Sequence, residues 1–123
     1  MVIHESAEDY LETILKLRQQ KGQVRSIDVV TDLHFSKPSV SVAMKKLRES
    51  GYITMAADGS ITLNESGLEI ASRVYSRHKA ITRLFEILGV SEEQAAVDAC
   101  KVEHDLSDET FACICAFIEK QEA

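Results

Sequence analysis

The sequence lacks the hallmarks of membrane, secreted and repetitive proteins. Its apolar runs fall well short of the roughly 20 residues needed to span a bilayer, so we expect no membrane partner. The first residues, MVIHESAEDY, turn acidic within five positions, which is unlike a signal or transit peptide and predicts a cytoplasmic protein. We find neither an internal repeat nor a low-complexity segment, and 123 residues suffice for one compact domain or two small fused ones.

Cysteine is scarce and odd in number, which argues against a disulfide scaffold. The chain has only Cys100, Cys113 and Cys115, so we predict reduced thiols in a cytoplasm. Cys113 and Cys115 stand in the apolar segment FACICAFI, where we expect them to be small buried residues.

Positive charge is also in short supply. The chain has 14 Lys and Arg against 20 Asp and Glu, a formal charge of −6, which argues against a general binder of polyanions. The deficit is uneven, because the segment ending at Ser72 carries eight basic and ten acidic residues and the rest carries six and ten. A local basic surface in the first segment is therefore still possible.

The spacing of apolar residues predicts three helices in the first 50 residues. The first opens with Ser6 as its N-cap and closes at Gly22, and the second is short and is capped by Ser26. The third has the strongest start, because Ser36-Lys37-Pro38-Ser39 places a cap before a proline in the first turn, and Gly51 suits its C′ position.

A hairpin and three further helices follow. In YITMAADGSITL, Asp58-Gly59 separates two short runs of strand-forming residues, a typical hairpin signal. A helical period then runs from Asn64 to Gly89, and Ser91 and Ser107 open two more helices. This order predicts a mainly α fold, in which a winged helix-turn-helix DNA-binding domain precedes an all-α domain.

The third predicted helix is the candidate for reading DNA. In a helix-turn-helix, residues near the start of the second helix of the pair meet base edges in the major groove. Residues 36–50 hold four basic side chains and one acid, although a solvated lysine-rich face would look the same. The wing has no Lys or Arg, so it would contribute through its backbone and a serine. The expected DNA-binding residues are Arg25, Ser36, Lys37, Pro38, Ser39, Ser41, Val42, Lys45, Lys46 and Ser60.

A second constellation has the chemistry of a metal site. Cys100, Glu103 and His104 have i, i+3 and i+4 spacing, so a thiolate, a carboxylate and an imidazole can share one helix face. Each residue also has an ordinary interpretation as a cap partner, a solvated acid, a core histidine or a small buried thiol. The complete candidate set is Asp9, Glu12, His78, Cys100, Glu103 and His104.

These stretches together resemble one family along nearly the whole chain, the diphtheria toxin repressor and manganese-transport-regulator family of metalloregulators. The matching segments are EDYLETILKL, SKPSVSVAMKKLRESGYI, ITLNESGLEIA, RVYSRHKAITRLF and ACKVEHDLSDE. The resemblance implies a winged-helix DNA-binding domain over residues 1–72 and a helical metal-binding and dimerisation domain over residues 73–123. It also implies metal ligands at the six candidate residues.

The resemblance is mixed between two branches of that family. Asp9 and Glu12 match manganese-type members, whereas Cys100 matches iron-type members. Thr82 and Ala96 stand where iron-type members carry ligands of a second metal site, so that site is not expected in its iron-type form. We therefore expect Fe(II) or Mn(II), with Zn(II) or Co(II) able to bind in vitro.

The expected function is metal-dependent repression of metal-homeostasis genes through palindromic operator DNA, which a homodimer would read. The apolar residues Phe111, Ile114, Phe117 and Ile118 are interpreted as part of a two-fold interface, although an internal core would explain them as well. A metal-independent regulator that senses a small molecule or oxidation at Cys100 is the first alternative. A small metalloenzyme is a second one, but no HExxH motif, glycine oxyanion loop or nucleophile elbow is present, so we expect neither an enzyme nor a small-molecule substrate.

Overall fold

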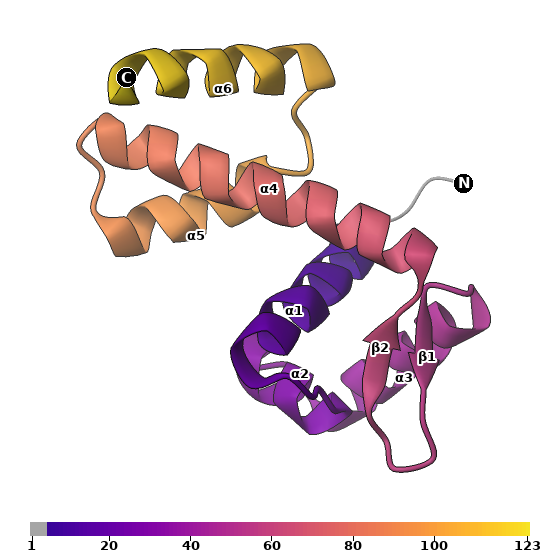
Figure 1. The fold of residues 1–123 in the computed structure, drawn as a ribbon. Coiled ribbons are helices and arrows are strands. Elements are labelled where there is room, and N and C mark those ends of the chain that lie inside the picture. Colours follow the sequence, from indigo (N-terminus) through magenta and orange to yellow (C-terminus); the bar gives the residue numbers. More distant parts are fainter. Residues whose placement is uncertain (1–4) are drawn as a thin grey trace. The chain divides into compact units, whose positions relative to one another are not determined.

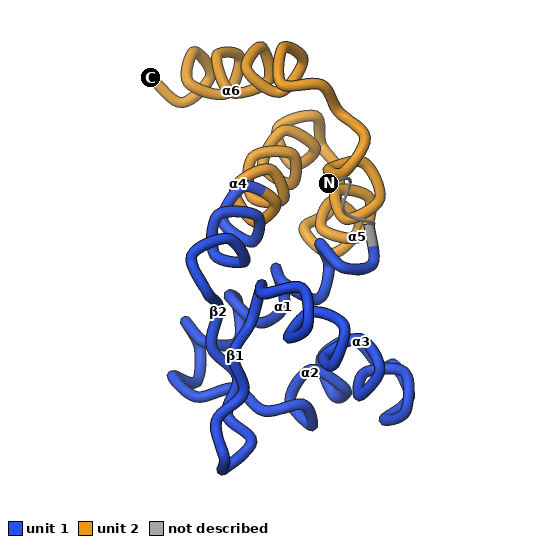
Figure 2. Tube along the Cα trace, turned by 90° about the vertical axis from the view of Figure 1, so that its right-hand side faces the viewer, with its two compact units in different colours: residues 1–73 blue, residues 74–123 orange. Residues whose placement is uncertain are grey.

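The structure is a computed structural model that describes residues 5–123, and it divides the chain into two compact units. The first unit ends at Arg73 and the second begins at Val74 (Figure 2). Within the described range, no helix combines the length and the apolar character that crossing a membrane requires.

The first unit contains three helices and a two-stranded sheet (Figure 1). Its elements are α1 (Glu5–Lys21), α2 (Ser26–Leu33), α3 (Lys37–Glu49), β1 (Ile53–Met55), β2 (Ile61–Leu63) and the first part of α4 (Glu65–Ile87). The strands are antiparallel, with Ile53 opposite Leu63 and Met55 opposite Ile61. Helix α1 contacts α2, α3 and β2, and the buried side chains between them include Leu11, Ile14, Val29, Val40, Met44 and Ile53. This is the predicted order of a winged helix-turn-helix.

The start and end of α3 agree with the sequence signals. The Ser36 hydroxyl accepts the backbone N–H of Ser39 at 3.3 Å, and Pro38 lies in the first turn, where its missing N–H costs nothing. Gly51 follows the helix with φ of 84°, a left-handed conformation that favours glycine.

Two of the predicted caps are wrong. Ser6 lies inside α1, which begins no later than Glu5. Ser26 is the first residue of α2 rather than its cap, and Arg25 is the N-cap residue. The carboxylate of Asp28 accepts the backbone N–H of Arg25 at 2.9 Å, so an acid inside the first turn satisfies the N–H of the N-cap residue.

A glycine allows the hairpin to approach the start of α4. A Cβ added at Gly67 would overlap the carbonyl oxygen of Tyr52 and lie 3.0 Å from its carbonyl carbon. The same oxygen accepts the backbone N–H of Asn64 at 2.9 Å, while the Asn64 side chain donates to the carbonyl of Gly51 at 3.0 Å. The end of the α3–β1 turn is thus fixed against the residues that lead into α4.

The second unit consists of the remainder of α4, α5 (Glu92–Val102) and α6 (Asp108–Glu122). Ser91 and Ser107 cap α5 and α6 as predicted, accepting backbone N–H groups at 3.3 and 3.1 Å. The buried apolar residues of this unit are Val74, Ile81, Ala95 and Ala99.

Helix α6 contributes no buried side chain in the single chain. Cys113 is exposed and Cys115 is partly exposed, so the expectation that both would be buried is wrong. The apolar character of FACICAFI belongs to a helix that leaves Phe117 41% exposed rather than to an internal core.

Candidate metal centre

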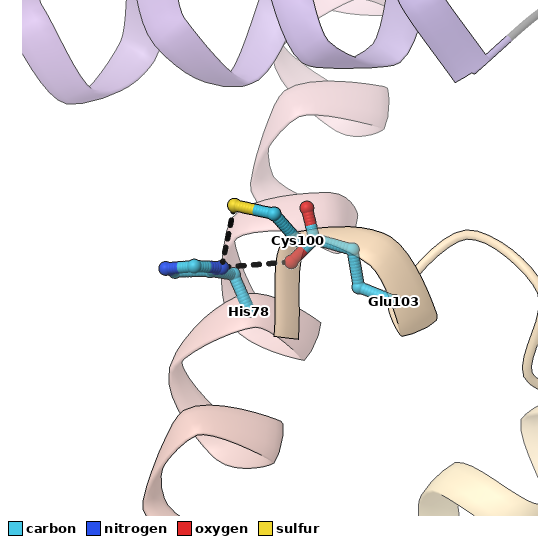
Figure 3. A group of neighbouring side chains, drawn as sticks. All are labelled: His78, Cys100 and Glu103. Carbon is cyan, nitrogen blue, oxygen red and sulfur yellow. Dashed lines mark hydrogen bonds and ion pairs between the residues drawn. The ribbon is translucent and has the colours of Figure 1, made fainter. Parts of the chain in front are cut away.

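The second unit brings three potential ligands together from two helices. His78 projects from α4, Cys100 from α5, and Glu103 is the C-cap residue of α5 (Figure 3). The i, i+3 spacing of Cys100 and Glu103 places both side chains on the α5 face that meets His78. The fold therefore brings Cys100 and Glu103 together with His78, whereas His104 lies in the turn beyond α5 and does not continue the helix face that the i, i+4 spacing predicted.

The ligand atoms lie close enough to share one ion. Nδ1 of His78 is 2.8 Å from Oε2 of Glu103 and 3.6 Å from Sγ of Cys100, and all three atoms lie within 4.8 Å of one another. Nε2 of His104, in the turn after α5, is 3.6 Å from the other carboxylate oxygen of Glu103. The cluster therefore combines a thiol, a carboxylate and two imidazoles.

Glu103 is the electrostatic centre of this cluster. Its side chain is buried, whereas an isolated carboxylate is rarely taken out of water without a positive partner. Among the residues that the structure describes, none donates a hydrogen bond to Oε1. An acid buried between two imidazoles, with acceptor capacity left over, suits a cation.

The same contacts determine the protonation of His78. The Cys100 sulfur and the Glu103 carboxylate, in that order, raise the pKa of His78 to about 10, although burial acts in the opposite direction. The His78 imidazole is therefore protonated near neutral pH, and its positive charge offsets the negative charge of the Glu103 carboxylate. A metal can bind its nitrogen only after that proton leaves.

The donor set fits a divalent transition metal. Thiolate and imidazole favour iron, cobalt and zinc, whereas carboxylate oxygens also serve manganese. In the described residues, His78, Cys100 and Glu103 form a group in which every member can offer one ligand atom. These three side chains could therefore hold a divalent ion.

Asp9 and Glu12 lie in the first unit, one helical turn apart on α1, and both are partly buried. The i, i+3 spacing that we inferred from the sequence is thus realised within the helix. Their assignment as metal ligands stays a prediction.

Eight of the predicted DNA-reading residues lie exposed on α3 or at its N-cap. Val40, Met44 and Leu47 are buried and hold one side of the helix against the first unit. The exposed members are Ser36, Lys37, Pro38, Ser39, Ser41, Val42, Lys45 and Lys46. This surface has the chemistry of a groove-binding helix, with hydroxyls and a short apolar side chain near its start and lysines along its length.

Arg25 and Ser60, the two remaining predicted DNA contacts, both lie near Asp58 of the wing. Asp58 accepts the hydroxyl of Ser60 at 2.7 Å, and its carboxylate lies 3.9 Å from the guanidinium of Arg25. These hydrogen bonds from Ser60 and the charge of Arg25 lower the pKa of Asp58, so this carboxylate stays ionised. The sequence analysis missed Asp58 as a partner of Arg25, because 33 positions separate them and only the hairpin brings them together.

Comparison with known proteins places both units in one group. Residues 3–61 match the family model of the iron dependent repressor N-terminal DNA binding domain, and residues 64–123 match that of the iron dependent repressor metal binding and dimerisation domain. The chain is 36% identical over 118 residues to an uncharacterized HTH-type transcriptional regulator of Methanocaldococcus jannaschii, with 94% of each chain covered. It is 33% identical over 119 residues to the transcriptional regulator MntR of Escherichia coli O6:H1, covering 97% of this chain and 77% of the relative.

A solved structure supports the same comparison. A manganese-dependent transcriptional repressor in complex with manganese superimposes with a TM-score of 0.83 at 27% identity, over 92% of this chain and 52% of that one. The present chain thus spans about half the length of the solved repressor.

Proposed function

Because the chain belongs to the iron dependent repressor family of metal-dependent transcriptional regulators, we propose that it represses metal-homeostasis genes in response to Fe(II) or Mn(II). It would bind palindromic operator DNA as a homodimer. The observation that carries this proposal is the cluster of His78, Cys100 and Glu103 in the unit whose family model is named for metal binding. The family is one of transcriptional regulators, so the chain is not an enzyme and the metalloenzyme alternative is excluded.

We assign His78, Cys100, Glu103 and His104 as the metal ligands of the second unit. The first three offer ligand atoms within 4.8 Å of one another, and the fourth approaches the same carboxylate. Asp9 and Glu12 are the ligands proposed from the first unit, because their carboxylates would supply the oxygen donors that manganese and iron accept. Ligands drawn from both units would make the ion an effector of the DNA-binding unit, with a typical coupling of about 1–3 kcal/mol.

The physiological metal is proposed from the chemistry of the ligands. The Cys100 thiolate softens the centre toward Fe(II), Co(II) and Zn(II), whereas the carboxylates favour harder ions such as Mn(II). Intrinsic affinity rises from Mn(II) through Fe(II) to Zn(II), so availability in the cell has to select among them. Fe(II) and Mn(II) are our candidates, and Zn(II) or Co(II) would bind in vitro.

The DNA interface is assigned to the exposed side of α3. Its lysines would contact phosphates and thereby set the register of the helix, while Ser39, Ser41 and Val42 lie near the N-terminus, where base edges are met. The side chains of the first turn include no Arg, Asn or Gln. We therefore propose that groove shape and thymine methyl groups carry much of the specificity.

A homodimer follows from the geometry of palindromic recognition. Two recognition helices have to lie about 34–36 Å apart, or a multiple of that distance, to read successive major grooves. The exposed apolar side chains of α6 are the proposed source of a two-fold interface, because no residue of this helix is buried in the single chain.

The proposal is tested by an electrophoretic mobility shift on a palindromic operator. We expect binding in Mn(II) or Fe(II) under anaerobic conditions and reversal by EDTA. Glu103→Ala and His104→Ala should abolish metal-dependent binding while the circular dichroism spectrum stays unchanged. Asp105→Ala, which removes an exposed acid from the same turn, is the matched control and should bind as the wild type does.

Equal binding with and without EDTA would refute metal dependence. That outcome would favour the metal-independent alternative, in which the exposed Cys100 thiol is the sensor. The two are separated by repeating the titration with Cys100→Ser and a mild oxidant.

A further inference from the structure

Among the residues that the structure describes, Arg77 is the only lysine or arginine that is buried. It lies on α4 immediately before His78, and its side chain is only 3% exposed. Arginine is almost never buried to this extent unless its donors are satisfied. Its partners therefore indicate why a charge is held inside the second unit.

The guanidinium of Arg77 binds three consecutive parts of the chain. It donates to the carbonyl of Glu103 at 3.3 Å, to the carbonyl of Leu106 at 2.6 Å and to the carboxylate of Asp108 at 2.6 Å. It also lies over the ring of Phe111, with 5.1 Å between the guanidinium carbon and the ring centroid. These partners cover the end of α5, the connecting turn and the start of α6.

The same turn carries two of the proposed metal ligands, Glu103 and His104. Arg77 holds the backbone of Glu103 through its carbonyl, while the neighbouring His78 meets the Glu103 side chain. Two adjacent residues of α4 thus fix the position and the orientation of one ligand residue. Without the guanidinium, the turn from Glu103 to Asp108 would lose three of its hydrogen bonds to α4.

We propose that Arg77 is a positioning residue of the metal centre, which holds the α5–α6 turn so that the Glu103 side chain faces His78 and His104 stays beside Glu103. This inference rests on the proposed function, because it concerns the same ligands. Arg77 contacts no metal itself. Groups that orient metal ligands typically change metal affinity by about 10- to 100-fold when they are removed.

Lysine should not replace this side chain. The acceptors are two carbonyls and a carboxylate, which Arg77 reaches through two different nitrogens. A guanidinium presents five donors in a rigid plane, whereas an ammonium is a compact charge on a flexible stem. A role in positioning therefore predicts that Arg77→Lys keeps the charge and still loses metal affinity.

The test is a Co(II) titration of the apo protein, followed through the absorption that Co(II) acquires from a cysteine thiolate. The variants are Arg77→Met, Arg77→Lys and Arg83→Met. Arg83 is the matched control, because it is an exposed arginine of the same helix that pairs with Glu122 of α6. Circular dichroism and thermal unfolding establish that each variant is folded at the titration temperature.

We expect Arg77→Met and Arg77→Lys to bind Co(II) about 10- to 100-fold more weakly than the wild type, with an altered absorption spectrum. Arg83→Met should keep both the affinity and the spectrum. A folded Arg77→Met with the affinity and spectrum of the wild type would overturn the inference, as would an equal loss in Arg83→Met. A purely structural role would lower the unfolding temperature and leave both metal readouts unchanged.

Asp108→Ala keeps the inference falsifiable if the Arg77 variants do not fold. The Asp108 side chain is 92% exposed, so its substitution removes a charged partner of Arg77 without opening a cavity. A weaker Co(II) affinity in the folded Asp108→Ala protein supports the inference, and an unchanged affinity overturns it. Failure of the wild type to bind Co(II) would instead refute the proposed function, and the inference with it.

Discussion

Gly67→Ala tests the packing between the hairpin and α4. The new Cβ would overlap the carbonyl oxygen of Tyr52 and lie 3.0 Å from the carbonyl carbon. Both atoms belong to the backbone, so they cannot turn away as the end of a flexible side chain can. Moving them would also stretch the hydrogen bond that Tyr52 accepts from the N–H of Asn64.

Two effects of opposite sign determine how much Gly67→Ala changes the free energy of unfolding. Alanine favours a helix over glycine by about 0.8–1.0 kcal/mol. Overpacking typically costs about 1–3 kcal/mol, and a weakened backbone hydrogen bond costs about 1 kcal/mol more. We therefore expect the free energy of unfolding to fall by about 1–3 kcal/mol, with Tm lower by roughly 4–8 °C for each kcal/mol in a unit of this size.

Thermal and urea unfolding, both followed by circular dichroism, measure this change. Glu69→Ala is the matched control, because it introduces alanine at an exposed position of α4 where a Cβ already exists. Its Tm should stay close to that of the wild type. A Tm for Gly67→Ala equal to or above the wild-type value would show that helix propensity outweighs the contact, and would refute the reasoning.

Three further predictions address the DNA surface, a helix cap and metal selectivity. Lys46→Gln should weaken DNA binding equally for all sequences and reduce the slope of log Kobs against log salt by about 0.9 per protomer, and an unchanged slope in filter-binding titrations would remove this residue from the interface. Asp28→Ala should lower the stability of the protein by about 0.5–1.5 kcal/mol at pH 7, because it removes the hydrogen bond that the N–H of Arg25 donates to the carboxylate at the start of α2. Lys21 and the N–H of Arg25 lower the pKa of Asp28, so its contribution is present above the unfolded-state pKa near 3.9 and is lost as pH falls through the folded-state pKa. A difference in urea midpoint that does not shrink as the pH is lowered below about 3.9 would contradict this origin. Cys100→Glu should shift preference from Co(II) and Zn(II) toward Mn(II) in competition titrations, and an unchanged order of affinities would mean that the thiolate is not a ligand.

Local signals accounted for most of the element boundaries. The caps at Ser36, Ser91 and Ser107 and the glycine at position 51 were correctly predicted, because each depends on hydrogen bonds within a few residues. The assignment of a cap to Ser6 failed, since α1 begins before the residue that looked like its cap.

The features that the sequence did not reveal depend on tertiary contacts. Cys113 is exposed because α6 buries none of its side chains, and composition does not show this. Arg77 shares the buried side of α4 with Val74 and Ile81, at i+3 and i+7 of one apolar period. A charged residue in an apolar period was the one sign in the sequence that Arg77 is buried. The groups that accept its hydrogen bonds are 26 to 31 residues away, so the spacing of residues could not identify them.

The contact between His78 and Glu103 has a consequence for periods of metal starvation. Zinc-finger modules unfold when their metal is removed, because nothing else holds their ligands together. Here the imidazole and the carboxylate meet at 2.8 Å through protein atoms alone, so this link between α4 and the end of α5 does not require an ion. A repressor built in this way should stay folded when metal is scarce.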